Sequence, residues 1–223
     1  MTQTIHRSDN ELHTNVTDEL LYNPSIDAAR LSVSTNSGVV TLSGEVDSLP
    51  ERHAAKRSAL RVWGVKAVTD DMVVVRDPGM SGAKDTDIAE AAKQMLNWAV
   101  DVPSDSVKAD VRNHTLTLSG TVKWQYQREA AARAVMYLKG VTAVTNSISL
   151  TTTAPASEAK AAIEAAILRN AQLDSGKIIV NVNGGEVTLN GSVQSWAERR
   201  QAGYVAWAAS GVTSVKNHLA ITS

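Results

Sequence analysis

The sequence predicts an α+β protein of three tandem α-β-β-α-β units, each a mixed three-stranded sheet with two helices on one face. Two observations carry this prediction. A nine-residue stretch occurs three times, at 38–46, 114–122 and 185–193, so that successive copies lie 76 and 71 positions apart. A Gly-Val-x-x-Val marker begins 20 residues after the glycine of each copy (Gly44, Gly120 and Gly191), at Gly64, Gly140 and Gly211. Self-similarity of this kind is typical of a repeated structural unit.

Each unit is predicted to open with a helix, because apolar residues recur every four positions on one stripe. The three stripes are Leu12, Val16 and Leu20, then Ile88, Ala92 and Leu96, then Ala159, Ile163 and Ile167. Ser8 and Glu11 have the spacing of a capping box. We expect Asp85 or Thr86 to cap the second of these helices and Ser157 the third.

Two strands joined by a tight turn follow each opening helix. Apolar residues alternate along the first strand, as at Leu31 and Val33, and this period of two indicates one buried face. The turns contain Asn or Gly, which tolerate positive φ. They lie at 36–38, 113–114 and 183–185. The glycine in the second strand (Gly44, Gly120, Gly191) indicates a bend or a close approach of backbone.

A second helix and a closing strand complete each unit. The helices are predicted to start near Pro50, Tyr126 and Ala197 and to stop at the marker glycines. Their predicted buried faces are rich in small residues and comprise Ala55, Ala59 and Val62, then Ala131, Val135 and Leu138, then Ala202, Ala206 and Ala209. The closing strand of each unit should run parallel to a strand of the hairpin by a crossover connection.

The predicted unit boundaries are 1–76, 77–151 and 152–223, with linkers at 76–84 and 151–156. Both linkers are rich in Gly, Ser, Thr or Pro, as linkers are. A single sheet continuous across all three units would contradict this division.

Composition excludes several classes of function. The formal net charge of −1 provides no global attraction to nucleic acid, and the absence of cysteine excludes disulfides and thiolate chemistry. No apolar run approaches the roughly 20 residues that span a bilayer. The N-terminal residues have no apolar core of a secretory signal, and acids begin at Asp9. We therefore expect a cytoplasmic protein, with the periplasm as the alternative.

The pattern resembles the BON domain family, named for bacterial osmotically inducible protein Y and nodulation proteins. The similarity covers nearly the whole chain three times. It rests on the V-x-L-x-G-x-V stretch, the Ala-rich second helix, the closing Gly-Val-x-x-Val, and a downstream arginine at Arg52, Arg128 and Arg199. The resemblance implies a non-enzymatic module, often periplasmic, linked to envelope stress and to phospholipid surfaces; some cytoplasmic members sense potassium. This chain departs from the family in its three copies, and we also expect it to differ in having no export signal.

Candidates for chemistry have simpler structural explanations. The five histidines show no metal-ligand spacing and do not recur between units. Asp85 and Asp87 suit the first turn of a helix, whose dipole they complement. Ser43 and Ser119 recur, but Asn190 replaces them in the third unit and no base recurs beside them. We therefore predict no catalytic centre, no cofactor and no metal site.

A basic ridge on the second helices is the candidate contact with an anionic surface. Its residues are Arg52, Lys56, Arg57 and Arg61, then Arg128 and Arg133, then Arg199 and Arg200. Trp196 precedes Arg199 and Arg200 at a helix start, and the third unit carries a net charge of +1 against −2 for the first. The alternative is an ordinary solvated helix face.

An apolar column beside the buried face consists of Leu60, Met136 and Trp207. We predict that these residues pack between units, with a ligand surface as the alternative. The remaining tryptophans do not occupy equivalent positions and fit either interface anchors or a membrane-interface belt. They are Trp63, Trp98, Trp124 and Trp196.

Two hypotheses of function follow. The first is a stress-associated binding protein whose tandem domains dock weakly on anionic phospholipid or an envelope component, with avidity from the copies. The second is a soluble stress protein acting through protein contacts or a small, potassium-like ion. Neither involves nucleic acid or a transmembrane segment, and an enzyme is a distant third.

Overall fold

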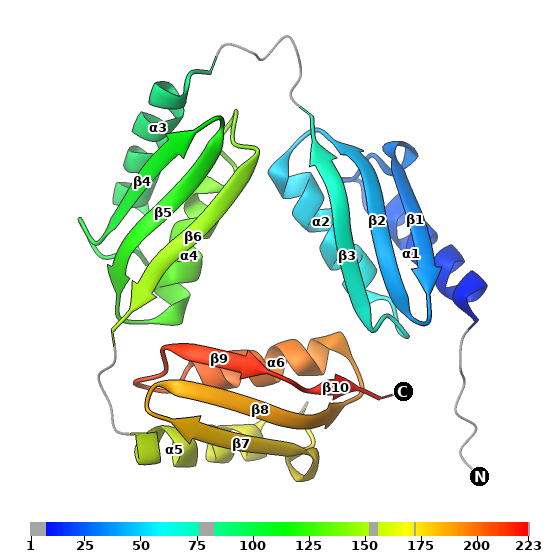
Figure 1. Ribbon diagram of the computed structural model, residues 1–223, viewed down its shortest axis with the longest axis vertical. Coiled ribbons are helices and arrows are strands. Elements are labelled where there is room, and N and C mark those ends of the chain that lie inside the picture. The colour runs from blue at the N-terminus through cyan, green and yellow to red at the C-terminus, as the bar shows by residue number, and fades with distance from the viewer. Residues whose placement is uncertain (1–7, 76–82, 152–155, 172, 223) are drawn as a thin grey trace.

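The computed structural model describes residues 8–75, 83–151, 156–171 and 173–222. It contains three units with the same order of elements, arranged around a common centre (Figure 1). We call residues 8–75 unit 1, 83–151 unit 2 and 156–222 unit 3. The two predicted linkers lie largely outside the described residues.

The elements follow the predicted α-β-β-α-β order in every unit. Those of unit 1 are α1 (Asp9–Tyr22), η1 (Ala28–Arg30), β1 (Leu31–Asn36), β2 (Val39–Val46), α2 (Leu49–Arg61) and β3 (Ala67–Val74). Those of unit 2 are α3 (Asp85–Trp98), β4 (Val107–Arg112), β5 (Thr115–Val122), α4 (Gln125–Val135) and β6 (Ala143–Leu150). Those of unit 3 are α5 (Ala156–Arg169), η3 (Ser175–Lys177), β7 (Ile178–Asn183), β8 (Glu186–Val193), α6 (Trp196–Trp207), β9 (Ser214–Asn217) and β10 (Ala220–Ile221).

Each unit has a separate mixed sheet whose middle strand is the second strand of the hairpin. In unit 1, β1 pairs antiparallel to β2, with Leu31 opposite Gly44, and β3 runs parallel to β2. Unit 2 repeats this arrangement with β4, β5 and β6. Both helices of a unit cover the same face of its sheet (Figure 1). The predicted fold class is therefore confirmed.

The closing strand of unit 3 is divided, which the sequence did not predict. β9 and β10 both pair parallel to β8, and His218 lies between them. Leu189 is opposite Asn217 and Ser192 is opposite Ala220, so the register is the same on both sides of the interruption.

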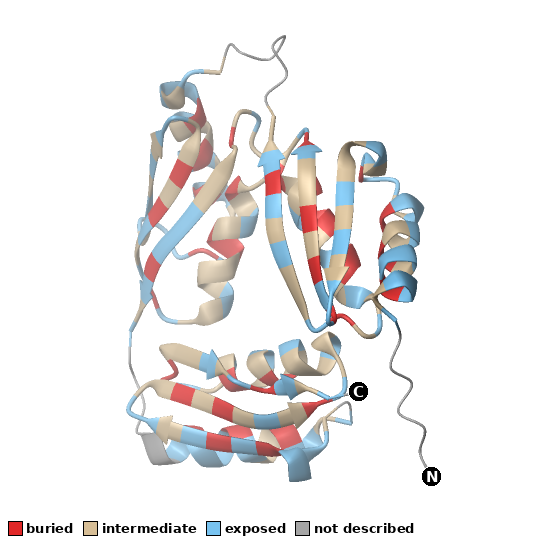
Figure 2. Cartoon of the chain, turned by 45° about the vertical axis from the view of Figure 1, so that its right-hand side comes forward, coloured by how far each residue is buried: buried red, intermediate tan, exposed pale blue. Residues whose placement is uncertain are grey.

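Buried and exposed positions alternate along the strands, as Figure 2 shows, and the buried side chains meet the helices in one core per unit. In unit 1, Leu42 and Val46 of β2 pack with Leu20 of α1 and Ala55 of α2. Small residues on α2 let this helix lie close to the sheet. Unit 2 and unit 3 have corresponding clusters, so each unit carries its own hydrophobic core.

The first helices are tied to the hairpin turns of their own units. Ser8 and Glu11 form the predicted capping box of α1. The N-cap of α3 is Lys84 rather than Asp85 or Thr86, because the Asp85 carboxylate instead accepts hydrogen bonds from the Asn113 and His114 amides, at 2.8 and 3.0 Å. Asp9 serves the turn of unit 1 in the same way. Helix α5 begins at Ala156, ahead of the predicted cap Ser157.

The glycine in each middle strand allows close backbone contact. At Gly191, φ is +120°, and a Cβ atom would lie 1.9 Å from the Lys177 carbonyl oxygen. Gly44 and Gly120 have the same conformation and the same kind of neighbour, a carbonyl oxygen of the segment entering the first strand. The predicted role of this glycine as a close-approach point is therefore what the structure shows.

Among the described residues, no helix combines the length and the apolar character needed to cross a bilayer.

Candidate functional site

The second helices α2, α4 and α6 bring the three units together, and each unit turns this helix and its closing strand toward the centre (Figure 1). The same repeat position leads each contact: offsets of 76 and 71 relate Leu49, Gln125 and Trp196, the first residues of these helices. Each approaches the next unit around the centre. We name the contacts the 1–2 seam, the 2–3 seam and the 3–1 seam.

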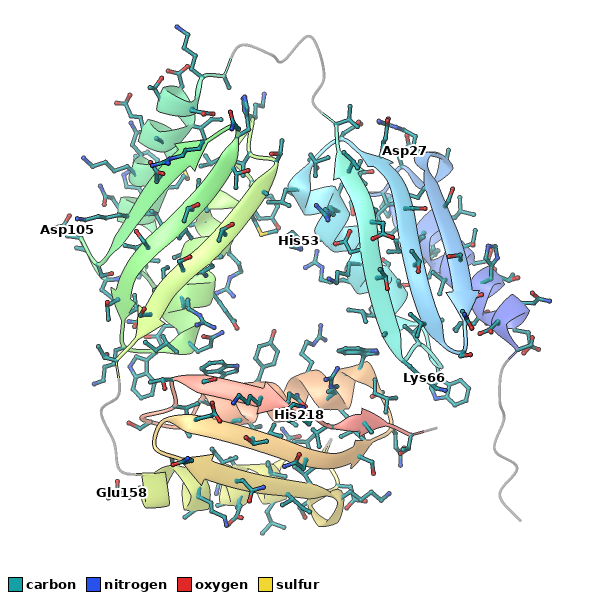
Figure 3. The ribbon with its side chains drawn as sticks, in the orientation of Figure 1. Asp27, His53, Lys66, Asp105, Glu158 and His218 are labelled. Atoms are coloured by element: carbon teal, nitrogen blue, oxygen red, sulfur yellow. The ribbon has the colours of Figure 1, made fainter. Side chains whose placement is uncertain are left out.

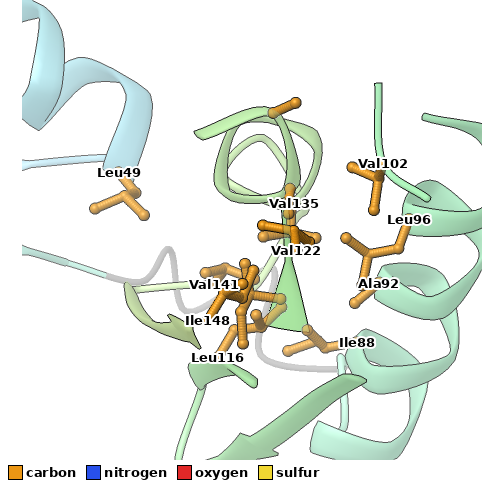
Figure 4. Packing of buried hydrophobic residues seen from close by; sticks show 13 residues of the cluster. Leu49, Ile88, Ala92, Leu96, Val102, Leu116, Val122, Val135, Val141 and Ile148 are labelled. Carbon is orange, nitrogen blue, oxygen red and sulfur yellow. The ribbon is translucent and has the colours of Figure 1, made fainter. Parts of the chain in front are cut away.

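Leu49 closes the 1–2 seam. It belongs to the hydrophobic cluster of unit 2 although it comes from unit 1, and it is only 5% exposed. Figure 4 shows it reaching from the start of α2 toward the side chains of the neighbouring unit. Burial of a leucine in this way contributes roughly 1.5–3 kcal/mol. Units 1 and 2 therefore share apolar contact beyond their covalent link.

Trp196 occupies the corresponding place in the 3–1 seam, where it packs against the hydrophobic cluster of unit 1. Beside it lies a cleft of about 580 Å³ between the end of α2 and the start of α6. We call this the 3–1 cleft. Its lining residues on which the argument depends are Arg57, Leu60, Trp63, Trp196, Arg199 and Arg200.

Several donors in the 3–1 cleft lack acceptors. The Arg199 guanidinium lies 4.6 Å from the centre of the Trp196 ring, and its Nη2 donates to the Asn217 carbonyl oxygen at 2.8 Å. Arg199 Nε and Trp196 Nε1 are buried and have no acceptor within the described part of the chain. Nor do Arg57 and Arg200 make an ion pair with any described residue. Such a cleft suits a ligand with negatively charged oxygens.

Other residues of the predicted basic ridge already have acidic partners in unit 1. Arg52 Nε donates to both Asp70 carboxylate oxygens, at 3.0 and 3.2 Å, and Lys56 Nζ lies 4.0 Å from the same carboxylate. Arg61 is paired with Glu19 at 2.6 Å. Asn146 and Asn217 stand at the positions equivalent to Asp70, so Arg128 and Arg199 lack this carboxylate. Among the described residues, the ridge is therefore least neutralised at Arg57, Arg128, Arg199 and Arg200.

The apolar column lies on the side of each seam that faces the leading residue of the neighbouring unit. Leu60, Met136 and Trp207 are each half-buried against the core of their own unit. Leu60 also lines the 3–1 cleft, and Met136 lines a cleft of about 490 Å³ at the 1–2 seam. Trp207 faces unit 2, because the Arg128 guanidinium lies 5.3 Å from its ring centre. Inter-unit packing through these residues remains our proposal.

The 2–3 seam holds a third cleft, of about 350 Å³, between the start of α4 and the end of α6. Four of its lining residues are aromatic: Trp124, Tyr126, Tyr204 and Trp207. Sequence reasoning missed this grouping, as it missed Leu49 and Gln125. The offsets of 76 and 71 relate position 49 to positions 125 and 196, and the residues there are Leu, Gln and Trp. This difference in residue type would have drawn attention to Leu49 and Gln125.

His53, labelled in Figure 3, lies on α2 where units 1 and 2 meet. Desolvation, assisted by Arg52, Arg57 and Lys56 and opposed by Asp70, lowers its pKa below the ordinary 6.5. The fold thus favours the neutral imidazole. The contribution of His53 to the free energy of unfolding is therefore complete above pH 6.5 and declines as the pH falls below that value. We expect urea unfolding to show a smaller loss of stability between about pH 7 and pH 5 in His53→Gln than in the native protein. Equal losses would contradict this assignment.

Within the described residues, no group of three or more His, Asp or Glu side chains is placed to hold a metal ion.

Comparison with known proteins gives the following matches. The family model described as "BON domain" matches residues 8–76, 84–152 and 155–223. "Osmotically-inducible protein Y" of Escherichia coli (strain K12) is 32% identical over 143 residues, which cover 63% of this chain and 71% of that protein. The C-terminal domain of CdsD, described as a structural protein of the type III secretion system of Chlamydia trachomatis, is 14% identical at a TM-score of 0.27, with 97% of this chain and 100% of that chain covered. The PrgH periplasmic domain is 13% identical at a TM-score of 0.23, with coverage of 92% and 99%.

Proposed function

This chain belongs to the BON domain family, as three tandem copies of the domain, and from that premise we propose a stress-associated binding protein that docks on anionic phospholipid surfaces. The similarity to an osmotically inducible protein supports the association with stress. The docking site we propose is the 3–1 cleft.

One observation supports the proposal: buried donors and guanidinium groups that find no acceptor or carboxylate among the described residues lie together beside apolar surface. Trp196 Nε1 and Arg199 Nε provide the buried donors. Arg57 and Arg200 add exposed positive charge at the same cleft, and Trp63, 44% exposed, adds an aromatic ring at its border. Phosphate oxygens would accept from the donors while glycerol and acyl carbons contact the apolar lining.

The expected affinity is low. A lysine or arginine near an anionic membrane contributes about 1 kcal/mol, and salt screens it over about 8 Å at physiological ionic strength. Arg57 and Arg200 would thus supply about 2 kcal/mol, which makes the binding weak, reversible and sensitive to salt. Peripheral docking of this kind requires no membrane-spanning element.

Charge reversal in the cleft tests the proposal. We expect Arg57→Glu/Arg200→Glu to lower the affinity for phosphatidylglycerol vesicles at low salt, measured by co-sedimentation, by about 30-fold or more. Two attractions of about 1 kcal/mol each are lost, and repulsion replaces them. High salt should abolish most of the native binding. The double variant Lys108→Glu/Arg112→Glu, which makes the same charge change on exposed residues of β4, is the matched control and should bind nearly as the native chain does.

Binding that survives both salt and the cleft variant would refute electrostatic docking at this site. No binding to anionic vesicles at all would favour the other hypothesis, a stress protein that acts through protein contacts. Fractionation of native cells into cytosol and periplasm would identify the membrane leaflet that the cleft could reach.

A further inference from the structure

The 2–3 seam differs from the other two seams at the residue that leads the contact. Leu49 packs against the core of unit 2 and Trp196 against the core of unit 1, each beside the cleft of its seam, whereas unit 2 presents Gln125 to unit 3. The Gln125 amide Nε2 donates back to Glu129 Oε1 at 3.0 Å, within its own helix. Its Oε1 is buried and has no donor among the described residues. Among the described residues, the leading position of this seam therefore carries a polar side chain where the other two carry an apolar one.

The lining of this seam has a distinct chemical character. Four aromatic rings, from Trp124, Tyr126, Tyr204 and Trp207, surround a space of about 350 Å³. Glu129 is the one charged residue among the described residues that line it, and Arg133 Nη1 lies 3.7 Å from its carboxylate on the side of α4 outside the lining. The rings also attract cations elsewhere, since Lys123 Nζ lies 5.5 Å from the Trp124 ring centre and the Arg128 guanidinium 5.3 Å from that of Trp207. Neither of these two cationic residues lines the cleft.

We propose that the 2–3 seam binds a small quaternary ammonium ion. Aromatic faces attract such a cation through their quadrupoles, and its methyl groups fill apolar space that a hydrated metal ion could not. The Glu129 carboxylate supplies the opposite charge, and the Gln125 Oε1 dipole adds a negative end at the same place. The ends of two helices meet here, and the negative C-terminal end of α6 offsets the positive N-terminal end of α4.

The proposed ammonium site uses other residues than the proposed phospholipid site, because no residue that lines the 2–3 cleft also lines the 3–1 cleft. The ligand would lie beside Gln125, at the repeat position where the other two seams carry Leu49 and Trp196. Arg128 opposes this ligand, since its charge lies on a ring that the ligand would use. Its removal should therefore strengthen binding, whereas removal of an arginine from an anion site would weaken it.

Titration calorimetry of the full chain with choline tests the proposal, with 3,3-dimethyl-1-butanol as the neutral compound of the same shape. We expect choline to bind about 10-fold more tightly than the alcohol, a difference between those of an exposed and a desolvated cation–π contact. Gln125→Leu should abolish choline binding, because a leucine fills this position in unit 1. The urea midpoint of Gln125→Leu should be no lower than that of the native chain. A loss of choline binding would then come from a filled site and not from unfolding.

Three further variants complete the experiment. Gln94→Leu makes the same substitution on the exposed face of α3 and should leave binding unchanged. Glu129→Gln should weaken binding and Arg128→Gln should strengthen it, each by about fivefold. Equal affinity for choline and the alcohol, undetectable choline binding, or undiminished binding by Gln125→Leu would each overturn the proposal.

The same ammonium group occurs free in solution and on phosphocholine headgroups, and a second arm distinguishes these sources. Sedimentation with phosphatidylcholine vesicles, compared between the native chain and Gln125→Leu, measures access to the lipid-bound group. Vesicle binding that Gln125→Leu removes would identify the headgroup as a ligand as well. Choline binding without vesicle binding would restrict the site to the free ion, and both results support the ammonium site.

Discussion

Replacing Gly191 by alanine is expected to destabilise unit 3 by about 3–5 kcal/mol, the largest effect of any single substitution considered. The φ of +120° is unfavourable for every residue with a Cβ, and the new methyl group would lie 1.9 Å from the Lys177 carbonyl oxygen. That oxygen belongs to the backbone of the segment entering β7, so it cannot move aside as a flexible side chain would. Relief requires β7 and β8 to separate where Ile178 pairs with Gly191.

Urea unfolding monitored by tryptophan fluorescence measures this cost, and Gly184→Ala is the matched control in the same hairpin. Gly184 also has a positive φ, +57°, but apart from its two chain neighbours no described residue has a heavy atom within 4 Å of the position that a Cβ would take. Its substitution should cost only about 1 kcal/mol, the strain of the left-handed conformation alone. If the two variants were equally stable, close backbone contact would not explain the glycine at position 191.

Replacing Trp196 by alanine is expected to open the 3–1 seam and to cost about 2–4 kcal/mol. The indole packs on the core of unit 1, and its loss leaves a cavity beside Leu60 and Val62. It also removes the ring on which the Arg199 guanidinium lies, so we expect binding to anionic vesicles to fall as well. Trp98→Ala, at an exposed tryptophan of α3, should change neither property.

The opening can be measured as a distance. The chain has no cysteine, so thiols introduced at exposed Val73 and Ile179 would be the sole sites for a fluorophore pair across units 1 and 3. We expect lower energy transfer in Trp196→Ala than in the native background. Unchanged transfer would mean that Trp196 does not close the seam.

Much of the fold was predictable because each unit repeats the same local rules. The alternation at Leu31 and Val33 and the four-residue spacing of Leu12, Val16 and Leu20 each specify a buried face. Because the copies are related by offsets of 76 and 71, each predicted element can be compared with two equivalent segments, which a single copy does not allow. The divided closing strand of unit 3 escaped prediction, since Val215, Leu219 and Ile221 alternate as a continuous strand would.

The candidate site was only partly predictable, because it depends on how units meet rather than on how each one folds. The sequence indicated Arg57, Arg199 and Arg200 as a basic surface but could not show that Asp70 neutralises Arg52 and Lys56 from another element. The aromatic residues of the 2–3 seam come from positions that are not equivalent in the repeat. Their grouping arises from the contact of α4 with α6, and no periodicity within either helix reveals it.

The head-to-tail arrangement of the seams also has a geometric consequence. Three rigid bodies that touch in a closed triangle do not have independent angles, so a change at one contact must be accommodated by at least one other. An occupant that widens or tightens the 2–3 seam would therefore alter the 3–1 cleft. Linkage then requires that an anion in the 3–1 cleft change the affinity for the ammonium ion by the same factor in return. Titrating each ligand in the presence of the other would measure this reciprocity. Three units joined only by their linkers, without contacts between them, would not show it.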